Sequence, residues 1–533
     1  MKKNFLYLFL LLTCLNLYSQ QKELIFQIVD KNYKTPISYA TVIIQELNRG
    51  THADFDGFFK IPELYFDNGS IKISSIGYNP LELKLSDFKK NEINKIYLTP
   101  FTESLDEIFI VSSKKRKTRS ISARSIVKKS IDNILINYPT EPHSYIGYYR
   151  DYQQPTNTNY QKVRELERNP KYINLNEGIV ESFDQGFYTN KLTHEKNQTA
   201  LYKFKTNQDF LIDSLLKIPY DNVSNKFLKD FSITSFGGNE LNILNITNAV
   251  RNHNTQSFSF VDVLDKNFVD NHSFKLESSK NMNGVSLYEI SFKSLQEQTS
   301  YDYNANGKIY ISKNDFSIYK LSYTIFYKND DIPQYSVLLE YLPKGDKMYL
   351  NYMMFNNFFT LKSKDFFKLE GISYIHKEKK INLFFNKPLL ENSSKPISKN
   401  IKIYYKNKRL KIKEVRLEEN SKKRIMLIMN VKQLRKIGFL DKNITKEEFN
   451  ANLRIDLKNI EAINGMIINE PSIFSFYQYR EFFVQEIFEN KNLPLEKKFM
   501  DKVLPISKAI QNPMNIKNEY WLNSPLKNTY KID

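Results

Sequence analysis

The chain reads Gly50-Thr51-His52-Ala53-Asp54-Phe55-Asp56-Gly57-Phe58-Phe59 between short apolar segments. Each segment is four to seven residues long and mostly alternates apolar with polar side chains, a pattern typical of half-buried β-strands. Seven strands are expected, at Glu23–Val29, Tyr39–Gln45, Phe58–Ile61, Ser70–Ser75, Leu81–Leu85, Asn94–Leu98 and Leu105–Val111. Seven strands in under ninety residues predict a small immunoglobulin- or transthyretin-like β-sandwich.

Four residues of the quoted segment have the properties of a tight turn: Asp54, Asp56, Gly57 and Phe59. Gly57 can adopt a positive φ, the two carboxylates can accept hydrogen bonds from the turn backbone, and Phe59 can return to the core. The same carboxylates are candidate calcium ligands, but calcium takes about six to eight oxygen ligands and one turn supplies few of them. The sequence therefore predicts a structural turn and no metal.

Further short motifs accompany this turn in a fixed order. They are Ile28-Val29-Asp30, Pro36-Ile37, Ala40-Thr41-Val42, Ser74-Ser75-Ile76-Gly77-Tyr78, Leu98-Thr99-Pro100 and Leu105-Asp106-Glu107-Ile108-Phe109-Ile110-Val111. With the turn, they resemble the carboxypeptidase-regulatory-like domain of Bacteroidetes envelope proteins over about a sixth of the chain, although Phe26 stands where that family often has glycine. The resemblance implies an accessory β-sandwich without a catalytic role. Such domains occur in outer-membrane systems, including the N-terminal extensions of TonB-dependent receptors.

The first twenty residues are predicted to be a secretory signal peptide. Lys2 and Lys3 precede the apolar stretch Phe5 to Leu17, and Leu17-Tyr18-Ser19-Gln20 offers a cleavage site. The apolar stretch is short for a membrane span, and no later stretch approaches twenty apolar residues. The protein is therefore expected to be exported to the periplasm or the outer membrane. Cys14 is an alternative lipid-attachment site, but the usual small residue before it is missing.

The remaining chain is predicted to be mainly β and multidomain. The expected regions are the sandwich at 21–112, a basic linker and helix at 113–143, a β-rich domain at 144–385, and an α+β region at 386–533 with a docked tail. In the third region, alternating stretches such as Ser317–Tyr327 and Met348–Asn356, separated by turn signals, predict a large antiparallel sheet. Its pattern resembles the open half-barrels of periplasmic lipoprotein carriers.

The last region is expected to combine strands with helices. Thr445 and Glu448 form a capping-box pattern at a helix start. A second helix is predicted over Ser475–Glu489, because one stripe of it would carry Phe476, Tyr479, Phe483 and Ile487. Its solvated face would carry Arg480, Glu481 and Glu486. The tail is expected to be anchored by Trp521, the sole tryptophan.

Positive charge is concentrated after the sandwich. Eight Lys or Arg residues and no acidic residue lie between Lys114 and Lys129, which predicts a solvated linker. Candidate anion-binding residues within it are Lys114, Lys115, Arg116 and Lys117. The net charge of +19 would suit a polyanion. Because a signal peptide is predicted, an anionic lipopolysaccharide or acidic glycan is favoured over nucleic acid.

Motifs of enzymes and cofactor sites are missing from the sequence. None of the six histidines has Glu or Asp three residues later, and neither a Gly-x-Ser-x-Gly motif nor a nucleotide-binding glycine loop occurs. We therefore predict no cofactor and no metal. The sequence favours a non-enzymatic, exported cell-envelope protein that binds a protein, glycan or lipid. Two alternatives stay open: a secreted hydrolase with scattered carboxylates, and a periplasmic lipid- or lipoprotein-binding protein.

Overall fold

The computed structural model describes thirteen stretches of the chain. They are residues 23–67, 69–90, 92–101, 121–217, 240–253, 268–295, 303–327, 332–375, 377–391, 397–436, 445–502, 504–513 and 520–527. Residue contacts divide the chain into two compact units. The first unit comprises Met1–Gln153, Tyr172–Phe358 and Gln478–Asp533, and the second comprises Gln154–Lys171 and Phe359–Tyr477. The second unit is therefore inserted in the sequence of the first. This grouping differs from the predicted division at residue 385.

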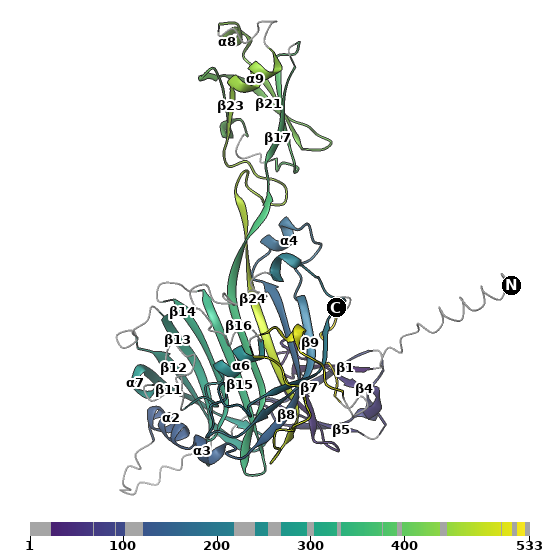
Figure 1. Cartoon of the computed structure of the whole chain (residues 1–533), viewed down its shortest axis with the longest axis vertical. Helices are drawn as coiled ribbons and strands as arrows, with labels where there is room; N and C mark the ends of the chain where they lie inside the picture. Colours follow the sequence, from purple (N-terminus) through teal and green to yellow (C-terminus); the bar gives the residue numbers. More distant parts are fainter. Residues whose placement is uncertain are drawn as a thin grey trace, which may run out of the picture. The chain divides into compact units, whose positions relative to one another are not determined.

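The N-terminal part of the first unit is a β-sandwich, as predicted (Figure 1). One sheet has the order β4-β1-β7 and the other β3-β2-β5-β6. The strands are β1 Glu23–Asp30, β2 Thr41–Ile44, β3 Arg49–His52, β4 Phe58–Pro62, β5 Ser70–Ser74, β6 Leu81–Lys84 and β7 Ile93–Leu98. The sequence analysis missed β3, which overlaps the start of the quoted segment, and its predicted strand at Leu105–Val111 lies outside the described residues. Phe26 and Phe59 stack in the core with ring centroids 4.7 Å apart.

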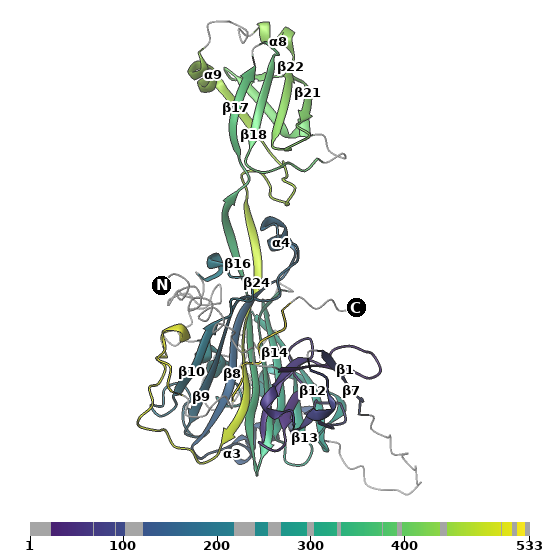
Figure 2. The same cartoon turned by 90° about the vertical axis from the view of Figure 1, so that its right-hand side faces the viewer.

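A ten-stranded sheet forms the largest part of the first unit (Figures 1 and 2). Its order is β10-β9-β8-β24-β16-β15-β14-β13-β12-β11. The strands are β8 His143–Pro155, β9 Ile173–Asp184, β10 Thr199–Thr206, β11 His272–Met282, β12 Val285–Ser294, β13 Tyr303–Ser312, β14 Ile318–Tyr327, β15 Pro333–Lys344, β16 Lys347–Phe366 and β24 Pro471–Phe488. From β11 to β16 each strand pairs antiparallel with the next one in the chain. This run is the predicted antiparallel sheet.

Strand β24 corrects one prediction, because Ser475–Glu489 was expected to be a helix. The segment is a strand that lies between β8 and β16 in the centre of the sheet. Its buried side chains Phe474, Phe476 and Gln478 recur every second residue, which is the period of a strand. From residue 480 to 485 both faces are buried. A strand covered on both faces has apolar residues at many spacings, and some of them coincide with a helical stripe.

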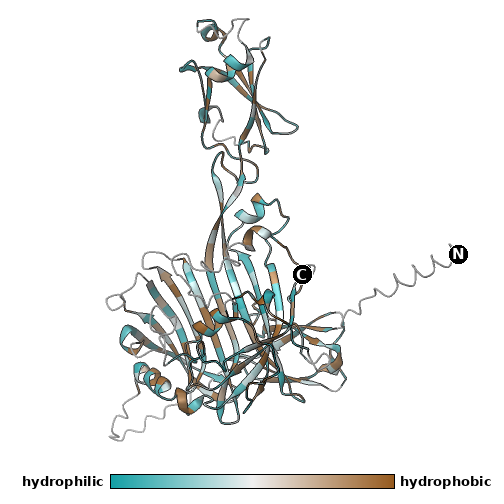
Figure 3. Cartoon of the chain, viewed as in Figure 1, coloured by the Kyte–Doolittle hydropathy of each residue, from teal (hydrophilic) through white to brown (hydrophobic). Residues whose placement is uncertain are grey.

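The two faces of the ten-stranded sheet are covered by different elements. One face, which we call the inner face, packs against four helices: α2 Ala123–Asp132, α3 Ile134–Asn137, α6 Glu240–Thr247 and α7 Phe268–Asn271. On β8, Tyr145 and Tyr149 belong to this inner core, whereas Ile146 and Tyr148 pack on the opposite face with Tyr39 of the sandwich. Because successive side chains of a strand point to opposite faces, the sandwich covers the outer face. Figure 3 shows hydrophobic and hydrophilic residues alternating along these strands.

The second unit contains two small sheets around its own core. Their orders are β17-β18-β22-β21 and β20-β19-β23. The elements are β17 Leu369–Ile375, β18 Lys380–Phe385, β19 Ile401–Tyr405, β20 Lys408–Leu410, β21 Ile412–Leu417, β22 Arg424–Met429 and β23 Leu453–Leu457, with α4 Asn159–Val163, α8 Val431–Lys436 and α9 Lys446–Asn452. Thr445 caps α9 by accepting the backbone N–H of Glu448 at 3.1 Å. Among the described helices of both units, none is long and apolar enough to cross a bilayer.

The described part of the tail, residues 520–527, ties the sandwich to the sheet. Trp521 is 4% exposed and belongs to the sandwich core, where its ring lies 5.8 Å from that of Tyr65. Its indole N–H donates to the carbonyl of Lys60 at 3.1 Å, and its own carbonyl accepts from Gln485 of β24 at 2.8 Å. One residue thus completes a core and contacts the neighbouring strand.

Replacing Trp521 with Ala is expected to lower the free energy of unfolding by about 3–5 kcal/mol, because a large buried side chain leaves a cavity. Scanning calorimetry of the variant should show a lower melting temperature. Tyr33→Ala is the matched control, since Tyr33 is an aromatic residue that is 80% exposed in the same sandwich. Equal melting temperatures for both variants would contradict the anchoring role of Trp521.

Candidate functional site

The predicted turn lies at the end of β3 and the start of β4. The carboxylate of Asp54 accepts the backbone N–H groups of Asp56 and Phe58, both at 2.9 Å. Gly57 has a φ of +78°, and a side chain there would come within 2.5 Å of the carbonyl oxygen of Ile28. Only glycine fits this combination of positive φ and close backbone contact. The other candidate residues, Lys114, Lys115, Arg116 and Lys117, lie outside the described residues, and anion binding by them stays a prediction.

The residues around this turn hold the sandwich against the outer face of the large sheet. Tyr39 stacks on Tyr352 of β16 with centroids 5.0 Å apart. Thr41 donates a hydrogen bond to Glu340 of β15 at 3.1 Å. Arg49 forms an ion pair with Glu486 of β24 at 2.6 Å. The sandwich therefore contacts three strands of the sheet, β15, β16 and β24. The sandwich surface that makes these contacts is not available to another partner.

A buried ion pair lies beneath the sandwich on the same outer face. Arg150 of β8 and Glu481 of β24 are 1% and 0% exposed at their side chains and approach to 2.6 Å. The hydroxyl of Tyr352 donates to the same carboxylate at 2.8 Å. The guanidinium also lies 4.9 Å from the ring centroid of Phe483. Glu481 was predicted on a solvated helix face. That prediction is wrong, because the segment is a central strand.

His52, which the sequence analysis did not single out, is buried in this interface. Its ring lies 5.5 Å from that of Tyr352 and 5.9 Å from that of Phe483. Burial lowers the pKa of His52 to about 4, although the nearby carboxylate of Glu340 partly opposes this shift. The imidazole is therefore neutral at physiological pH, and protonating it would place a charge between two buried surfaces.

Acid should destabilise the first unit partly through His52. The pKa of His52 is about 4 in the folded protein and about 6.5 in the unfolded chain. The contribution of the neutral imidazole to the free energy of unfolding is therefore fully present above pH 6.5 and is lost as the pH falls towards 4. Between pH 8 and pH 5, the free energy of unfolding of His52→Phe should therefore fall by about 2 kcal/mol less than that of wild type. Urea unfolding followed through the fluorescence of Trp521 measures this difference. Parallel pH profiles for the two proteins would disprove it.

The inner face of the sheet is the largest continuous apolar surface of the first unit. Its side chains come from strands on both sides of the centre and form one cluster with the covering helices. Members on the strands include Tyr145, Tyr149, Val180, Leu201, Leu287, Ile290, Ile309, Ile311, Leu321, Tyr323, Ile325, Val337, Leu339, Tyr341, Leu350, Met353, Phe355, Phe482 and Val484. Such a face can bind an apolar ligand only where a covering helix moves away and exposes it.

Helix α6 crosses this inner face and is buried on nearly all sides (Figure 1). We call residues 240–253, which include α6, the α6 segment. Its hydrogen bonds with the two sheet tyrosines Tyr323 and Tyr341 lie at the C-terminal end. Tyr323 donates a hydrogen bond to the carbonyl of Thr247 at 3.3 Å, and Tyr341 donates to the side-chain oxygen of Asn248 at 2.7 Å. Both tyrosines project from the sheet, so the sheet itself holds the end of the helix.

An ionic cluster fixes the end of the α6 segment. Arg251 donates two hydrogen bonds to the buried carboxylate of Asp184 on β9, at 2.8 and 2.9 Å. Lys191 approaches the same carboxylate at 3.2 Å. Burial opposes the ionisation of Asp184, but the two cations hold its pKa well below the usual range. The cluster therefore stays charged at neutral pH and anchors the segment to the edge strands.

Comparison with known families identifies the N-terminal part. Residues 27–110 match the family model described as CarboxypepD_reg-like domain. This part of the protein is a CarboxypepD_reg-like domain. The match confirms the resemblance seen in the sequence, and the structure adds that the CarboxypepD_reg-like domain rests on a much larger sheet. No curated protein matches the chain.

Solved structures show only weak similarity to the protein. A LolA superfamily protein from Nitrosomonas europaea is 12% identical, with a TM-score of 0.18, and the match covers 45% of this chain and 86% of that one. A DUF1329 family protein from Desulfovibrio piger is 10% identical, with a TM-score of 0.19, over 45% and 87% of the two chains. Values this low establish no function for the protein.

The sequence contained few signals for the residues that the structure brings together. Arg251 lies 67 residues after Asp184 in the chain, and one sequence gives no indication that they meet. In the part of the chain that the structure describes, no group of three His, Cys, Asp or Glu side chains is placed to hold a metal ion. The candidate site is therefore the inner face with the α6 segment, and the CarboxypepD_reg-like domain supports that sheet from behind.

Proposed function

We propose that the protein is a non-enzymatic binding protein of the cell envelope. Its ten-stranded sheet would hold the acyl chain of a lipid or lipoprotein against the inner face. The observation that carries this proposal is the α6 segment, an apolar helix that lies on a continuous apolar sheet face and accepts hydrogen bonds from Tyr323 and Tyr341 of that sheet. An acyl chain that takes the place of the helix would make the same kind of apolar contacts.

The outer face supports the same proposal by its contrast with the inner face. Its contacts with the CarboxypepD_reg-like domain include the ion pair of Arg49 with Glu486, a hydrogen bond from Thr41 to the Glu340 carboxylate, and the stacked rings of Tyr39 and Tyr352. Breaking such an interface would leave buried charges without partners, which is costly. On the inner face the helix α6 itself makes mainly apolar contacts, which another apolar group can replace at a small cost, and the ion pairs lie beyond its end, at Arg251. Ligand exchange is therefore proposed on the inner face, and the domain would serve as a fixed support.

Binding of an apolar probe should increase when the α6 segment is loosened. We expect the purified protein to bind 1-N-phenylnaphthylamine, and the double variant Tyr323→Phe with Tyr341→Phe to bind it up to about thirtyfold more tightly. The reason is that two hydrogen bonds of about 1 kcal/mol each no longer hold the helix in place. A fluorescence titration measures both affinities.

Tyr78→Phe is the matched control for this titration, because its hydroxyl donates to Asp30 within the CarboxypepD_reg-like domain, away from the inner face. The control should bind like wild type. If neither wild type nor the double variant binds the probe, the inner face is an ordinary core and the proposal fails. If the probe does bind, mass spectrometry of lipids extracted from protein purified from its own host would identify the natural ligand.

Export is a separate part of the proposal and has its own test. The mature protein is expected in the periplasmic or outer-membrane fraction, starting at Gln21 after cleavage of the predicted signal peptide. Cell fractionation followed by mass spectrometry of the N-terminal peptide determines both. Recovery of the uncleaved chain in the cytoplasm alone would exclude an envelope function.

A further inference from the structure

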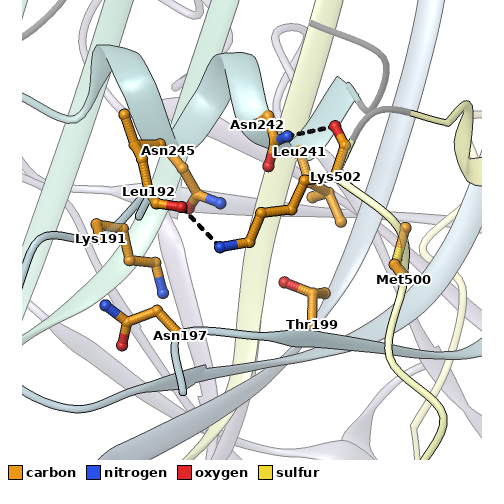
Figure 4. Close-up of a pocket in the computed structure, with 9 residues that line it drawn as sticks. All are labelled: Lys191, Leu192, Asn197, Thr199, Leu241, Asn242, Asn245, Met500 and Lys502. Atoms are coloured by element: carbon orange, nitrogen blue, oxygen red, sulfur yellow. Dashed lines mark hydrogen bonds between the residues drawn. The ribbon is translucent and has the colours of Figure 1, made fainter. Parts of the chain in front are cut away.

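A small hollow lies beside the start of the α6 segment, in the first unit (Figure 4). It is formed by three parts of the chain: the connection between β9 and β10 with Lys191 and Asn197, the helix α6 with Asn242 and Asn245, and the stretch before the tail with Lys502. The space measures about 10 Å³ for the centre of a water-sized group, which is room for about one such group. The hollow therefore fits one oxygen atom of a larger ligand.

Six polar side chains line this hollow: two are lysines, the others are neutral Asn and Thr side chains, and none is a carboxylate. Figure 4 shows the ammonium groups of Lys191 and Lys502 and the hydroxyl of Thr199 directed towards the same space. Lys502 donates to the carbonyl of Leu192 at 2.7 Å, and it forms no ion pair with a carboxylate among the described residues. Its backbone carbonyl accepts from Asn242 at 2.6 Å, which fixes the position of Lys502 relative to α6.

The charge in this region is not balanced. Lys191 and Arg251 share the single carboxylate of Asp184, and Lys502 adds a third cation. Among these four described side chains, three are cations and one is a carboxylate. Burial and the neighbouring Lys191 lower the pKa of Lys502, as expected for an ammonium group that lacks a counter-ion. A bound anion would relieve this repulsion.

Apolar residues connect the hollow to the inner face. Leu241 and Met500 line it, and both belong to the same apolar cluster as the inner face of the sheet. A positively charged pocket thus borders the proposed acyl-chain surface. Ligands with an anionic head and an apolar tail have the matching arrangement.

We propose that Lys191 and Lys502 bind the anionic oxygen of a carboxylate or phosphate head group, while its acyl chain lies on the inner face. This inference rests on the proposed function and extends it by naming the ligand class. Lys502 is the residue that determines specificity, because Lys191 already has a partner in Asp184. Neutral lipids would lose this contact but keep the apolar one.

The test compares decanoate with decanol, which share a chain and differ in charge, on the purified full chain. Isothermal titration calorimetry should show that Lys502→Gln weakens decanoate binding about tenfold or more, because a charge-assisted hydrogen bond is lost. Decanol binding should not change. The glutamine can still donate to the Leu192 carbonyl, and equal melting temperatures will show that folding is unaffected.

Lys498→Gln is the matched control, because it removes the same charge from an exposed position four residues away. It should leave decanoate affinity unchanged. If Lys502→Gln binds decanoate as well as wild type does, the assignment of the head-group site is overturned while the acyl-chain proposal stands. If neither decanoate nor decanol binds but inorganic phosphate does, and Lys502→Gln abolishes that, the pocket binds a free anion and the acyl-chain proposal fails.

Discussion

The position of β24 in the middle of the sheet is the constraint on which the rest of the first unit depends. This strand comes late in the chain, yet it lies between β8 and β16. Its Glu481 accepts hydrogen bonds from Arg150 of one neighbour and Tyr352 of the other, so one buried carboxylate joins three strands. Removing either the acid or the arginine would leave an unpaired buried charge, a change that typically costs about 3–5 kcal/mol. The pair therefore specifies which strands meet at this seam.

A sheet of ten strands has two faces to cover, and the protein covers them in chemically different ways. The CarboxypepD_reg-like domain meets the outer face with charges and hydrogen bonds that require one exact geometry. The inner face meets the side chains of α6 mainly through apolar contacts, which tolerate shape changes better, and its polar contacts include two tyrosine hydrogen bonds and the Arg251–Asp184 ion pair. This difference separates a rigid support from a surface suited to exchange. The positively charged hollow beside α6 lies at the margin of the second surface, where an amphipathic ligand would have its head group.

The sequence predicted those features that depend on local patterns. Alternating residues and turn signals indicated the sandwich and the antiparallel run, and the family motifs identified the domain. The helix prediction at Ser475–Glu489 failed, because a strand buried on both faces has no single polar face to show its period. For the same reason, Glu481 was wrongly predicted to be exposed to solvent. The contacts of Asp184 with Arg251, and of Trp521 with the sandwich, depend on long-range packing. Local sequence patterns contain no information about such contacts.

The late arrival of β24 also matters for how the protein is made. Until residue 488 has emerged during synthesis, β8 and β16 present unpaired backbone groups along two open edges. Such edges are templates for pairing with other chains, and partly built sheets aggregate through them. The chain is therefore most prone to such pairing before β24 has been made. A truncation that ends before Pro471 would leave both edges open permanently.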